Sequence, residues 1–407
     1  YYQVGGSAQY TNDIKSFGID QMIASVDAKQ LSASNFANQY DSPGAANYQT
    51  SKLGALNSQL VSQGTQNFLG ILGQVKSSST PLEATLAARV DRWTSQIPTM
   101  YSQQFVGGVG QAILSQNIPN QSKTKFSPNL GLLYQATKEL DFRSSAYQAF
   151  HAPGMNNQLR SYGNSSSGFY FGNPNLTPET MTGYEIGSDY RWKSGFVQVT
   201  GFNNFIRNAV ATYKLSGASN ADIDLAKQLC GTTGNPLAAV QAGSPCTSTT
   251  LNYYTNAQNI QSQGLEFQYH HDLNSSWGLD AGYARTRTFN TWTTTSDAAY
   301  GRNQLGGVPQ NIASAGVTYY PATKASITTT LRYVGNSWMN TDHVNPVPAY
   351  AIVGLRANYE LTQNATIYAS VVNLLNRNYI TFNSATSSSN YQAGMPQSFT
   401  VGARLNF

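Results

Sequence analysis

Regular alternation of apolar with small or polar side chains is the feature that most constrains the fold of this chain. Between Phe399 and Phe407 every second residue is apolar, and the residues between them are small, polar or charged. The segments 325–333 and 353–360 repeat this pattern closely. Successive side chains of a β-strand point to opposite faces, so the period of two predicts strands with one apolar and one polar face.

Composition separates the two folds that such strands could build, a soluble sandwich with an apolar core or a membrane barrel with an apolar exterior. Charged residues make up 11% of the 407 residues and aromatic residues 12%, whereas an ordinary soluble domain has roughly 25% charged residues. No run of about 18 apolar residues occurs, which excludes a membrane-spanning helix. The composition therefore favours an outer-membrane β-barrel, whose strands need apolar residues only on the side that faces lipid.

Segment lengths predict the topology. Short polar turns alternate with long segments, as in bacterial barrels with tight periplasmic turns and long external loops. We expect an all-β fold, a transmembrane antiparallel β-barrel with about 14 strands, the first of which runs outward from the periplasm. The expected strands are 1–18, 66–76, 82–93, 123–135, 140–151, 179–192, 196–212, 253–273, 276–290, 308–321, 325–339, 347–361, 365–380 and 394–407. Two of the long external segments are 19–65 and 213–252, and a helix over Ala221–Leu229, capped by Asn220, is expected in the second.

The start of the chain lacks the features that an exported protein needs. It begins at Tyr1 with no initiator Met, no basic segment and no apolar signal segment. A barrel protein must first cross the inner membrane, which requires a signal. The sequence is therefore expected to be the C-terminal part of a longer protein.

Cys230 and Cys246 are the two cysteines of the chain, and both fall in the expected external segment 213–252. The periplasm and the cell surface are oxidising, so we expect a disulfide bond between them. Two free thiols or a metal-binding pair are the alternatives, but no His in that segment completes a ligand set.

Two proline-containing motifs lie at the ends of the expected external segment 152–178. Phe150-His151-Ala152-Pro153 ends one strand, and Asn173-Pro174-Asn175-Leu176-Thr177-Pro178-Glu179 opens the next. Proline has no N–H to donate and so stops ladder pairing, and the residue before it is held extended or in a turn. On physical grounds these motifs form an ordered loop base, where Glu179 can meet basic groups on the inner wall.

This pair of motifs resembles the signature of TonB-dependent outer-membrane receptors, a Phe-Arg-Ala-Pro-like element followed by Asn-Pro-Asp/Asn-Leu-x-Pro-Glu. A near-terminal Asn-Leu element and a final aromatic residue, the family's assembly signal, also match. His151 stands where the family usually has Arg. The matching residues are Phe150, Pro153, Asn173, Pro174, Leu176, Pro178, Glu179, Asn373, Leu374 and Phe407.

The resemblance identifies residues 1–407 as a partial TonB-dependent receptor β-barrel domain and is strongest over 126–407. It implies a barrel of about 22 strands whose lumen holds a separate plug domain. With about 14 strands here, roughly eight strands, the plug and its TonB-contacting segment are expected to be absent from this sequence.

A ligand-binding vestibule is the functional site that the sequence favours. No Ser/His/Asp set, paired carboxylate or Gly-rich phosphate loop occurs in a credible context, so we expect neither an enzyme nor a bound cofactor or metal. Aromatic rings and Arg residues on external segments suit an anionic or amphipathic ligand, although an interfacial aromatic girdle would use the same residue types. The candidate ligand-binding residues are Arg160, Tyr162, Phe169, Tyr170, Phe171, Trp292, Arg302 and Trp338, and further external aromatics include Tyr213, Tyr253 and Tyr254.

The resemblance also implies a location and partners. It places the chain in the outer membrane as a multi-pass barrel that imports a scarce large solute, by default an iron–siderophore complex. Haem, cobalamin and oligosaccharide are alternatives within the family, and a passive channel or adhesion barrel is the alternative outside it. The expected partners are the TonB–ExbB–ExbD energy-transducing complex, outer-membrane lipid and lipopolysaccharide, and the barrel-assembly machinery. A formal net charge of +5 gives no indication of nucleic-acid binding.

Overall fold

Long antiparallel strands make up most of the chain. The computed structural model describes residues 1–16, 18–40, 56–106, 109–110, 114–115, 118–164, 168–216, 219–230, 250–384 and 390–406. Fifteen of its strands have eight or more residues. They are β1 (Tyr2–Asn12), β2 (Gln21–Tyr40), β3 (Leu56–Ser79), β4 (Leu82–Val106), β7 (Gln121–Gln135), β8 (Leu140–His151), β11 (Glu179–Trp192), β12 (Gly195–Lys214), β13 (Leu251–Asn274), β14 (Trp277–Thr293), β15 (Asn311–Ala322), β16 (Ala325–Val334), β19 (Tyr350–Thr362), β20 (Ala365–Val372) and β23 (Ser398–Leu405).

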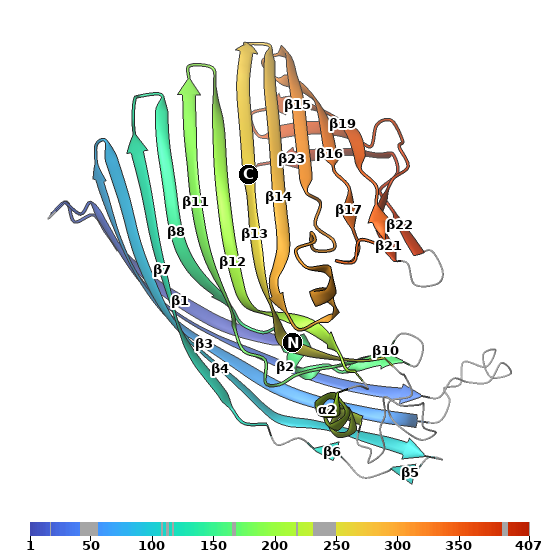
Figure 1. The fold of residues 1–407 in the computed structure, drawn as a ribbon. Coiled ribbons are helices and arrows are strands. Elements are labelled where there is room, and N and C mark those ends of the chain that lie inside the picture. Colours follow the sequence, from blue (N-terminus) through green and yellow to red (C-terminus); the bar gives the residue numbers. More distant parts are fainter. Residues whose placement is uncertain are drawn as a thin grey trace.

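Each long strand pairs with the next long strand along the chain, so the sheet is a continuous antiparallel meander from β1 to β23. Figure 1 shows that this sheet is strongly curved. Short turns join the strands at one end, which we call the short-turn end, and long segments join them at the other, the long-loop end. No pairing joins β1 to β23 among the described residues, so the sheet has two free edges there.

β2 corrects the predicted topology. The segment 19–65 was expected to be one long external loop, but residues Gln21–Tyr40 form a strand, of which Met22–Ser32 pair with the whole of β1. A short turn over residues 13–20 therefore joins β1 to β2. With this additional strand, β1 runs toward the short-turn end, opposite to the expected direction.

The registers assign each strand residue to a face, because directly opposed residues lie on the same side of a sheet. Val26, Ile71, Val90 and Phe126 form one row across β2, β3, β4 and β7, and all four are exposed. We call this apolar side the outer face. In β23, Phe399 and Val401 continue it, with exposed fractions of 71% and 83%.

The opposite, inner face is polar and charged. Next to that apolar row, Asp27, Gly70, Asp91 and Lys125 lie opposite one another on the same four strands. An apolar exterior and a polar interior are the arrangement of a membrane barrel. The alternation predicted from the sequence therefore corresponds to a lipid-facing and a lumen-facing row.

Aromatic rings gather on the outer face at the short-turn end. Trp192 contacts Tyr190 and Tyr269, and its Nε1 donates a hydrogen bond to His271 Nδ1 at 3.0 Å. Trp277 packs against Tyr319 with ring centroids 4.5 Å apart. Amphipathic rings in such a belt mark the boundary between lipid hydrocarbon and water.

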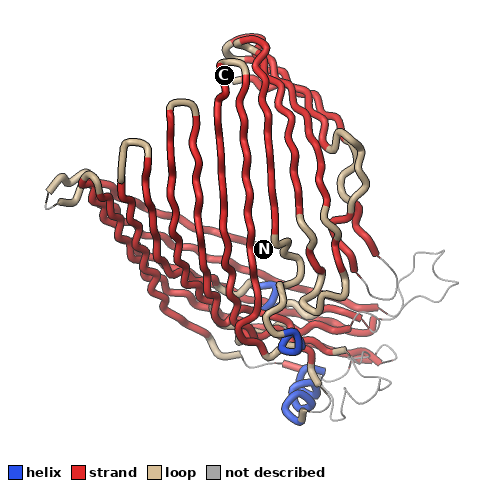
Figure 2. Tube along the Cα trace, turned by 45° about the horizontal axis from the view of Figure 1, so that its top comes forward, coloured by secondary structure: helices blue, strands red, loops and turns tan. Residues whose placement is uncertain are grey.

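The described residues form few helices, and these lie toward the long-loop end (Figure 2). They are α1 (Met155–Leu159), α2 (Asn220–Cys230) and the 3₁₀-helix η2 (Ser296–Tyr300). α2 matches the predicted helix, but its cap is Ser219, whose Oγ accepts a hydrogen bond from Asp222 N at 3.3 Å, and not Asn220. Among the described residues, no helix is long and apolar enough to cross a lipid bilayer.

Several strand ends differ from the prediction. The strand expected over 325–339 is interrupted. β16 ends at Val334, and a separate short strand, β17 (Ser337–Trp338), pairs with β18 (Pro346–Val347). The strand expected over 365–380 is shorter, because β20 ends at Val372. There the Asn373 turn begins, and residues 380–393 contain the hairpin of β21 (Ile380–Ser384) and β22 (Asn390–Ala393).

Candidate functional site

The segment between β8 and β11 does not extend away from the sheet but folds across its interior. α1 packs against β2, β3 and β4, where Met155 and Leu159 join Ala33, Ile97 and Met100 in a buried apolar cluster. Farther along, β10 (Gly168–Phe171) pairs in parallel with the start of β13. β9 (Tyr162–Asn164) pairs antiparallel with β10. One segment thus contacts two separate parts of the inner wall.

Polar side chains of the wall anchor α1. Gln66 is 1% exposed, and its Nε2 donates to Pro153 O at 2.9 Å and to Gln158 Oε1 at 2.7 Å. Ser62 Oγ donates to Leu159 O at 2.7 Å. Buried hydrogen bonds of this kind hold one geometry, because each group left without a partner would cost desolvation energy.

The second proline motif forms the buried base of the same segment. Asn173 Nδ2 donates to Tyr254 O at 2.8 Å, and its Oδ1 accepts from Asn175 N at 2.8 Å. Pro174 O accepts from Gln158 Nε2 at 3.3 Å and from Gln121. Pro153, Leu176 and Pro178 are also buried. The motif residues therefore join α1, β7 and β13.

His151 and Glu179 meet at this base. His151 Nδ1 lies 3.6 Å from Glu179 Oε2, and Glu179 Oε1 accepts a hydrogen bond from Val210 N at 2.6 Å. Val210 follows a register shift in β12, so the carboxylate satisfies a backbone N–H that the irregular ladder exposes. Phe150, the first residue of the motif, lies half-buried opposite Thr180.

A cation and two tyrosine rings form a stack near the base, and a third tyrosine is hydrogen-bonded to it. The Arg160 guanidinium lies 4.7 Å from the centre of the Tyr162 ring, which stacks on Tyr170 at 5.2 Å with an interplanar angle of 8°. The hydroxyls of Tyr162 and Tyr254 are 3.0 Å apart. Burial, together with this hydrogen bond, raises the pKa of Tyr254, and burial raises that of Tyr253 to about 12. Both phenols are therefore neutral at physiological pH.

Arg160 also lines a cavity of about 240 Å³. Its lining includes Tyr1, Ala33, Asn35, Met155, Asn156 and Arg160. Asn35 Nδ2 is buried there without a hydrogen-bond partner in the part of the chain that the structure describes. The cavity thus combines an exposed guanidinium and amide groups with apolar walls, which suits an anionic or amphipathic ligand.

The other two aromatic residues of the segment lie in a packed cluster. Phe169 and Phe171 pack with α2, Leu215 and Leu251 around Cys230. Tyr213 OH donates to Asp222 Oδ2 at 3.1 Å, which ties α2 to β12. Cys230 is disulfide-bonded. Cys246 lies outside the described residues, so the pairing of Cys230 with Cys246 stays a prediction.

Trp338 belongs to a second group of loops. Its ring stacks on His343 at 4.8 Å, and His343 Nε2 donates to Gln304 O at 2.9 Å. Thr341 Oγ1 donates to Asp297 Oδ2 at 2.9 Å, so the loops around residues 294–310 and 335–349 are locked together. Trp292 is half-exposed near the end of β14.

Arg302 lies on the outer face. Its guanidinium is 4.2 Å from the centre of the Phe289 ring, and Phe289 is opposite Gln261 in an outer-face row. The structure therefore brings together Arg160, Tyr162 and Tyr170 of the predicted residues, but it places Arg302 away from them.

The near-terminal Asn-Leu motif organises a turn. Asn373 is 1% exposed and has a positive φ of 52°. Its Nδ2 donates to Arg377 O and Met395 O, and its Oδ1 accepts from Arg377 N at 2.9 Å. Leu374 N donates to Val353 O at 2.7 Å. Phe407 lies outside the described residues.

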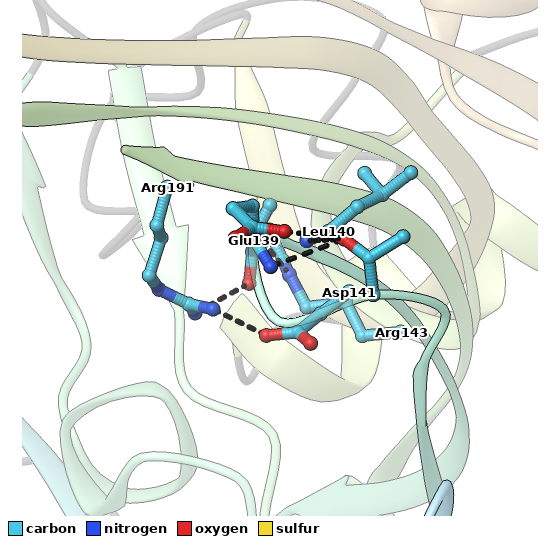
Figure 3. Close-up of polar contacts among 7 residues, drawn as sticks. Glu139, Leu140, Asp141, Arg143 and Arg191 are labelled. Atoms are coloured by element: carbon cyan, nitrogen blue, oxygen red, sulfur yellow. Dashed lines mark hydrogen bonds and ion pairs between the residues drawn. The ribbon is translucent and has the colours of Figure 1, made fainter. Parts of the chain in front are cut away.

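Ion pairs strengthen the inner face at the short-turn end. Figure 3 shows Arg191 beside the turn of Glu139 and Leu140, where it pairs with Asp141. Arg191 also lies 3.4 Å from Asp189, which accepts a hydrogen bond from Arg143 Nε at 3.1 Å. These carboxylates already have cationic partners. In the described part of the chain, no group of three or more His, Cys, Asp or Glu side chains could hold a metal ion.

Sequence reasoning found the cation and rings of the stack but not the groups that fix them. Gln66, Gln158 and Asn35 are ordinary polar residues in the sequence. Their importance arises only from the inward fold of residues 152–178, which no local pattern signals. Proline at both ends of that segment was the one signal of an ordered base.

Known proteins resemble this chain in sequence and in fold. The family model "TonB dependent receptor-like, beta-barrel" matches residues 1–374. An iron-regulated outer membrane virulence protein of Vibrio cholerae serotype O1 is 22% identical over 284 residues, which is 67% of this chain and 39% of that protein.

Solved structures share the fold over the whole chain. The ferric-catecholate import receptor Fiu from E. coli K12 has a TM-score of 0.70 at 15% identity, and the ferric yersiniabactin uptake receptor FyuA from Yersinia pestis 0.69 at 14%. The copper transporter OprC has a TM-score of 0.67 at 15% identity. Each match covers 100% of this chain, but only 54% of the Fiu and FyuA chains and 57% of the OprC chain.

Proposed function

This chain belongs to the TonB-dependent receptor β-barrel family of the outer membrane, and from that premise we propose that it takes part in importing an iron–siderophore complex. The short-turn end is then periplasmic and the long-loop end extracellular. Residues 1–407 would form part of one barrel domain. The chain spans about two fifths of the curated relative's length and about half of the similar solved chains, so the activity proposed is that of the whole receptor.

The inward-folded segment 152–178 is the observation that supports this proposal. It presents Arg160, which lies over the Tyr162 ring of the Tyr162–Tyr170 stack and also lines the cavity that contains Asn35. Among the described residues, Arg160 forms no ion pair. A guanidinium beside flat rings, open to an incoming anion, suits an anionic, aromatic ferric catecholate better than a neutral sugar.

The names of similar proteins agree with this ligand class. Fiu is a ferric-catecholate import receptor, FyuA is a ferric yersiniabactin uptake receptor, and the Vibrio cholerae protein is an iron-regulated outer membrane protein. The proposed partners are TonB–ExbB–ExbD as the energy source, the barrel-assembly machinery and outer-membrane lipid.

The test is transport by the full-length receptor in iron-limited cells. We expect Arg160→Gln combined with Tyr170→Leu to weaken ferric-siderophore binding about tenfold or more, since one guanidinium contact and one ring contact are lost. Binding and uptake of radioactive iron would be measured with each purified siderophore. Arg332→Gln combined with Tyr184→Leu makes the same chemical changes on β16 and on the outer face of β11, outside the Arg160 stack, and should leave binding unchanged.

Two results would contradict the proposal. If no chelate supports iron-limited growth through the receptor, haem, cobalamin or an oligosaccharide becomes the better ligand. If uptake continues in cells that lack TonB, the protein is a passive channel.

A further inference from the structure

Charge is distributed unevenly between the two faces of the sheet. Every carboxylate in the fifteen long strands lies on the inner face by its register. These residues are Asp27, Glu83, Asp91, Asp141, Glu179, Glu185, Asp189, Glu266, Asp272, Asp280 and Glu360. The outer face of these strands therefore has no acidic side chain that could neutralise a cation there.

Arginines nevertheless occur on the outer face. Arg92 lies opposite Leu69, Arg207 opposite Thr180, and Arg285 opposite Leu265. Arg285 and Arg287 follow the periplasmic-side residue Trp277 by eight and ten positions, close to the roughly 9–11 strand residues that cross the hydrocarbon. They therefore lie at the outer boundary of the apolar band, next to the outer-leaflet headgroups.

The arginines of β14 form a cluster with a third one. Arg287 and Arg302 contact the Phe289 ring at 5.1 and 4.2 Å from its centre. Phe289 is fully buried, and Arg287 Nη2 donates to Arg302 O at 3.5 Å. The loop that contains Arg302 is held to β14 by a hydrogen bond from Leu305 N to Thr288 O at 2.8 Å. The ring and the loop thus fix two guanidinium groups before any ligand binds.

None of the three guanidinium groups has an anionic partner in the described part of the chain. Arg285, Arg287 and Arg302 are all exposed, and none forms an ion pair with a described carboxylate. Arginine forks match phosphate oxygens in pairs and are less strongly hydrated than lysine. The cluster is therefore suited to phosphate groups.

We propose that Arg285, Arg287 and Arg302 bind the phosphate groups of an outer-leaflet glycolipid, at a site separate from the ligand vestibule. The position favours a lipid over a soluble anion, because the cluster lies on the lipid-facing side directly beyond the apolar row of Tyr283 and Phe267. A phosphorylated lipid can place acyl chains on that row and its phosphates on the arginines at once.

Native mass spectrometry of the full-length receptor tests this site. The probe is bis-phosphorylated lipid A, compared with the same lipid after removal of its phosphates. Arg285→Gln with Arg287→Gln should reduce the retained phosphorylated lipid by about tenfold or more, because two of three phosphate contacts are lost. Phe289→Leu keeps an apolar side chain but removes the ring, and should reduce retention by about two- to fivefold.

The control is Arg332→Gln with Arg404→Gln, which removes the same charge from exposed residues of the inner face. It should leave lipid retention unchanged, and heat-modifiable migration should show that all variants fold. Equal retention in the outer-face and control variants would overturn the proposal, as would equal binding of the dephosphorylated lipid. Full displacement of the lipid by millimolar inorganic phosphate would also overturn it, because the site would then bind any phosphate.

Discussion

At Gly70 the absence of a side chain makes room for a charged network on the inner face. Arg89 Nε donates to both oxygens of Asp91, at 2.8 and 2.9 Å, and its two Nη atoms donate to Asp27 at 2.6 and 3.0 Å. Asp27 is on β2 and Asp91 on β4, so the guanidinium must lie across β3. A Cβ atom at Gly70 would overlap that guanidinium.

We therefore expect Gly70→Ala to displace Arg89 and leave two carboxylates without their counter-ion. The free energy of unfolding should fall by about 1–2 kcal/mol, near the lower end of the range for charged hydrogen bonds because these side chains are part-exposed. Urea unfolding of the full-length receptor in lipid vesicles would measure it. Gly73→Ala is the control, since a Cβ there meets nothing within 4 Å; an equal loss in this variant would show that the effect belongs to the strand and not to Arg89.

At the scale of elements, Gln66 of the wall helps to hold α1 in place, together with Ser62. Gln66 donates to both Pro153 O and Gln158 Oε1, and Gln158 in turn donates to Pro174 O. Gln66→Met keeps the length of the side chain but leaves Pro153 O without this donor and Gln158 Oε1 with only the 3.3 Å bond from Ser95 Oγ. We expect backbone amides of α1 to exchange hydrogen about ten- to a hundredfold faster, equivalent to 1–3 kcal/mol.

Hydrogen–deuterium exchange with peptide-level mass spectrometry would measure this opening. Gln74→Met makes the same change on the same face of β3, where the Gln74 side chain forms no hydrogen bond to a described residue and lies opposite Ile23. Exchange in α1 that is unchanged in Gln66→Met would mean that the apolar contacts of Met155 and Leu159 alone hold the segment.

The element missed by sequence reasoning, β2, shows why the prediction was incomplete. Strands that face water-filled space alternate clearly, and those around residues 325–361 were predicted on that basis. In β2 the inner face also carries apolar residues, Leu31 and Ala33, because it packs against α1. Because apolar residues occur on both faces, this segment does not show a strict alternation of apolar and polar residues, and it was not predicted to be a strand.

The candidate site, like the fold, could be predicted only in part from the sequence. Its aromatic rings and Arg160 are conspicuous in a chain with little charge, and the family motif located the loop base. Tyr170 and Tyr254 come together, however, through the parallel pairing of β10 with β13. That contact joins segments about 80 residues apart and depends on the inward fold, which only the three-dimensional structure provides.

At the scale of the whole molecule, the two faces of the sheet assign every strand residue to lipid or to lumen, and tryptophan fluorescence can test that assignment. Trp277 lies on the outer face in the periplasmic-side aromatic belt, whereas Trp93 is fully buried on the inner face, opposite Phe68 and Lys123. In receptors that retain one tryptophan and have Phe at the others, lipids brominated near the headgroup should quench Trp277 strongly and Trp93 hardly at all, because bromine quenches only on contact. Bromine placed at the chain ends should quench Trp277 less, since the belt marks the edge of the hydrocarbon. Strong quenching of Trp93 would reverse the two faces, and with them the lumen position of Arg160 and the lipid position of Arg285.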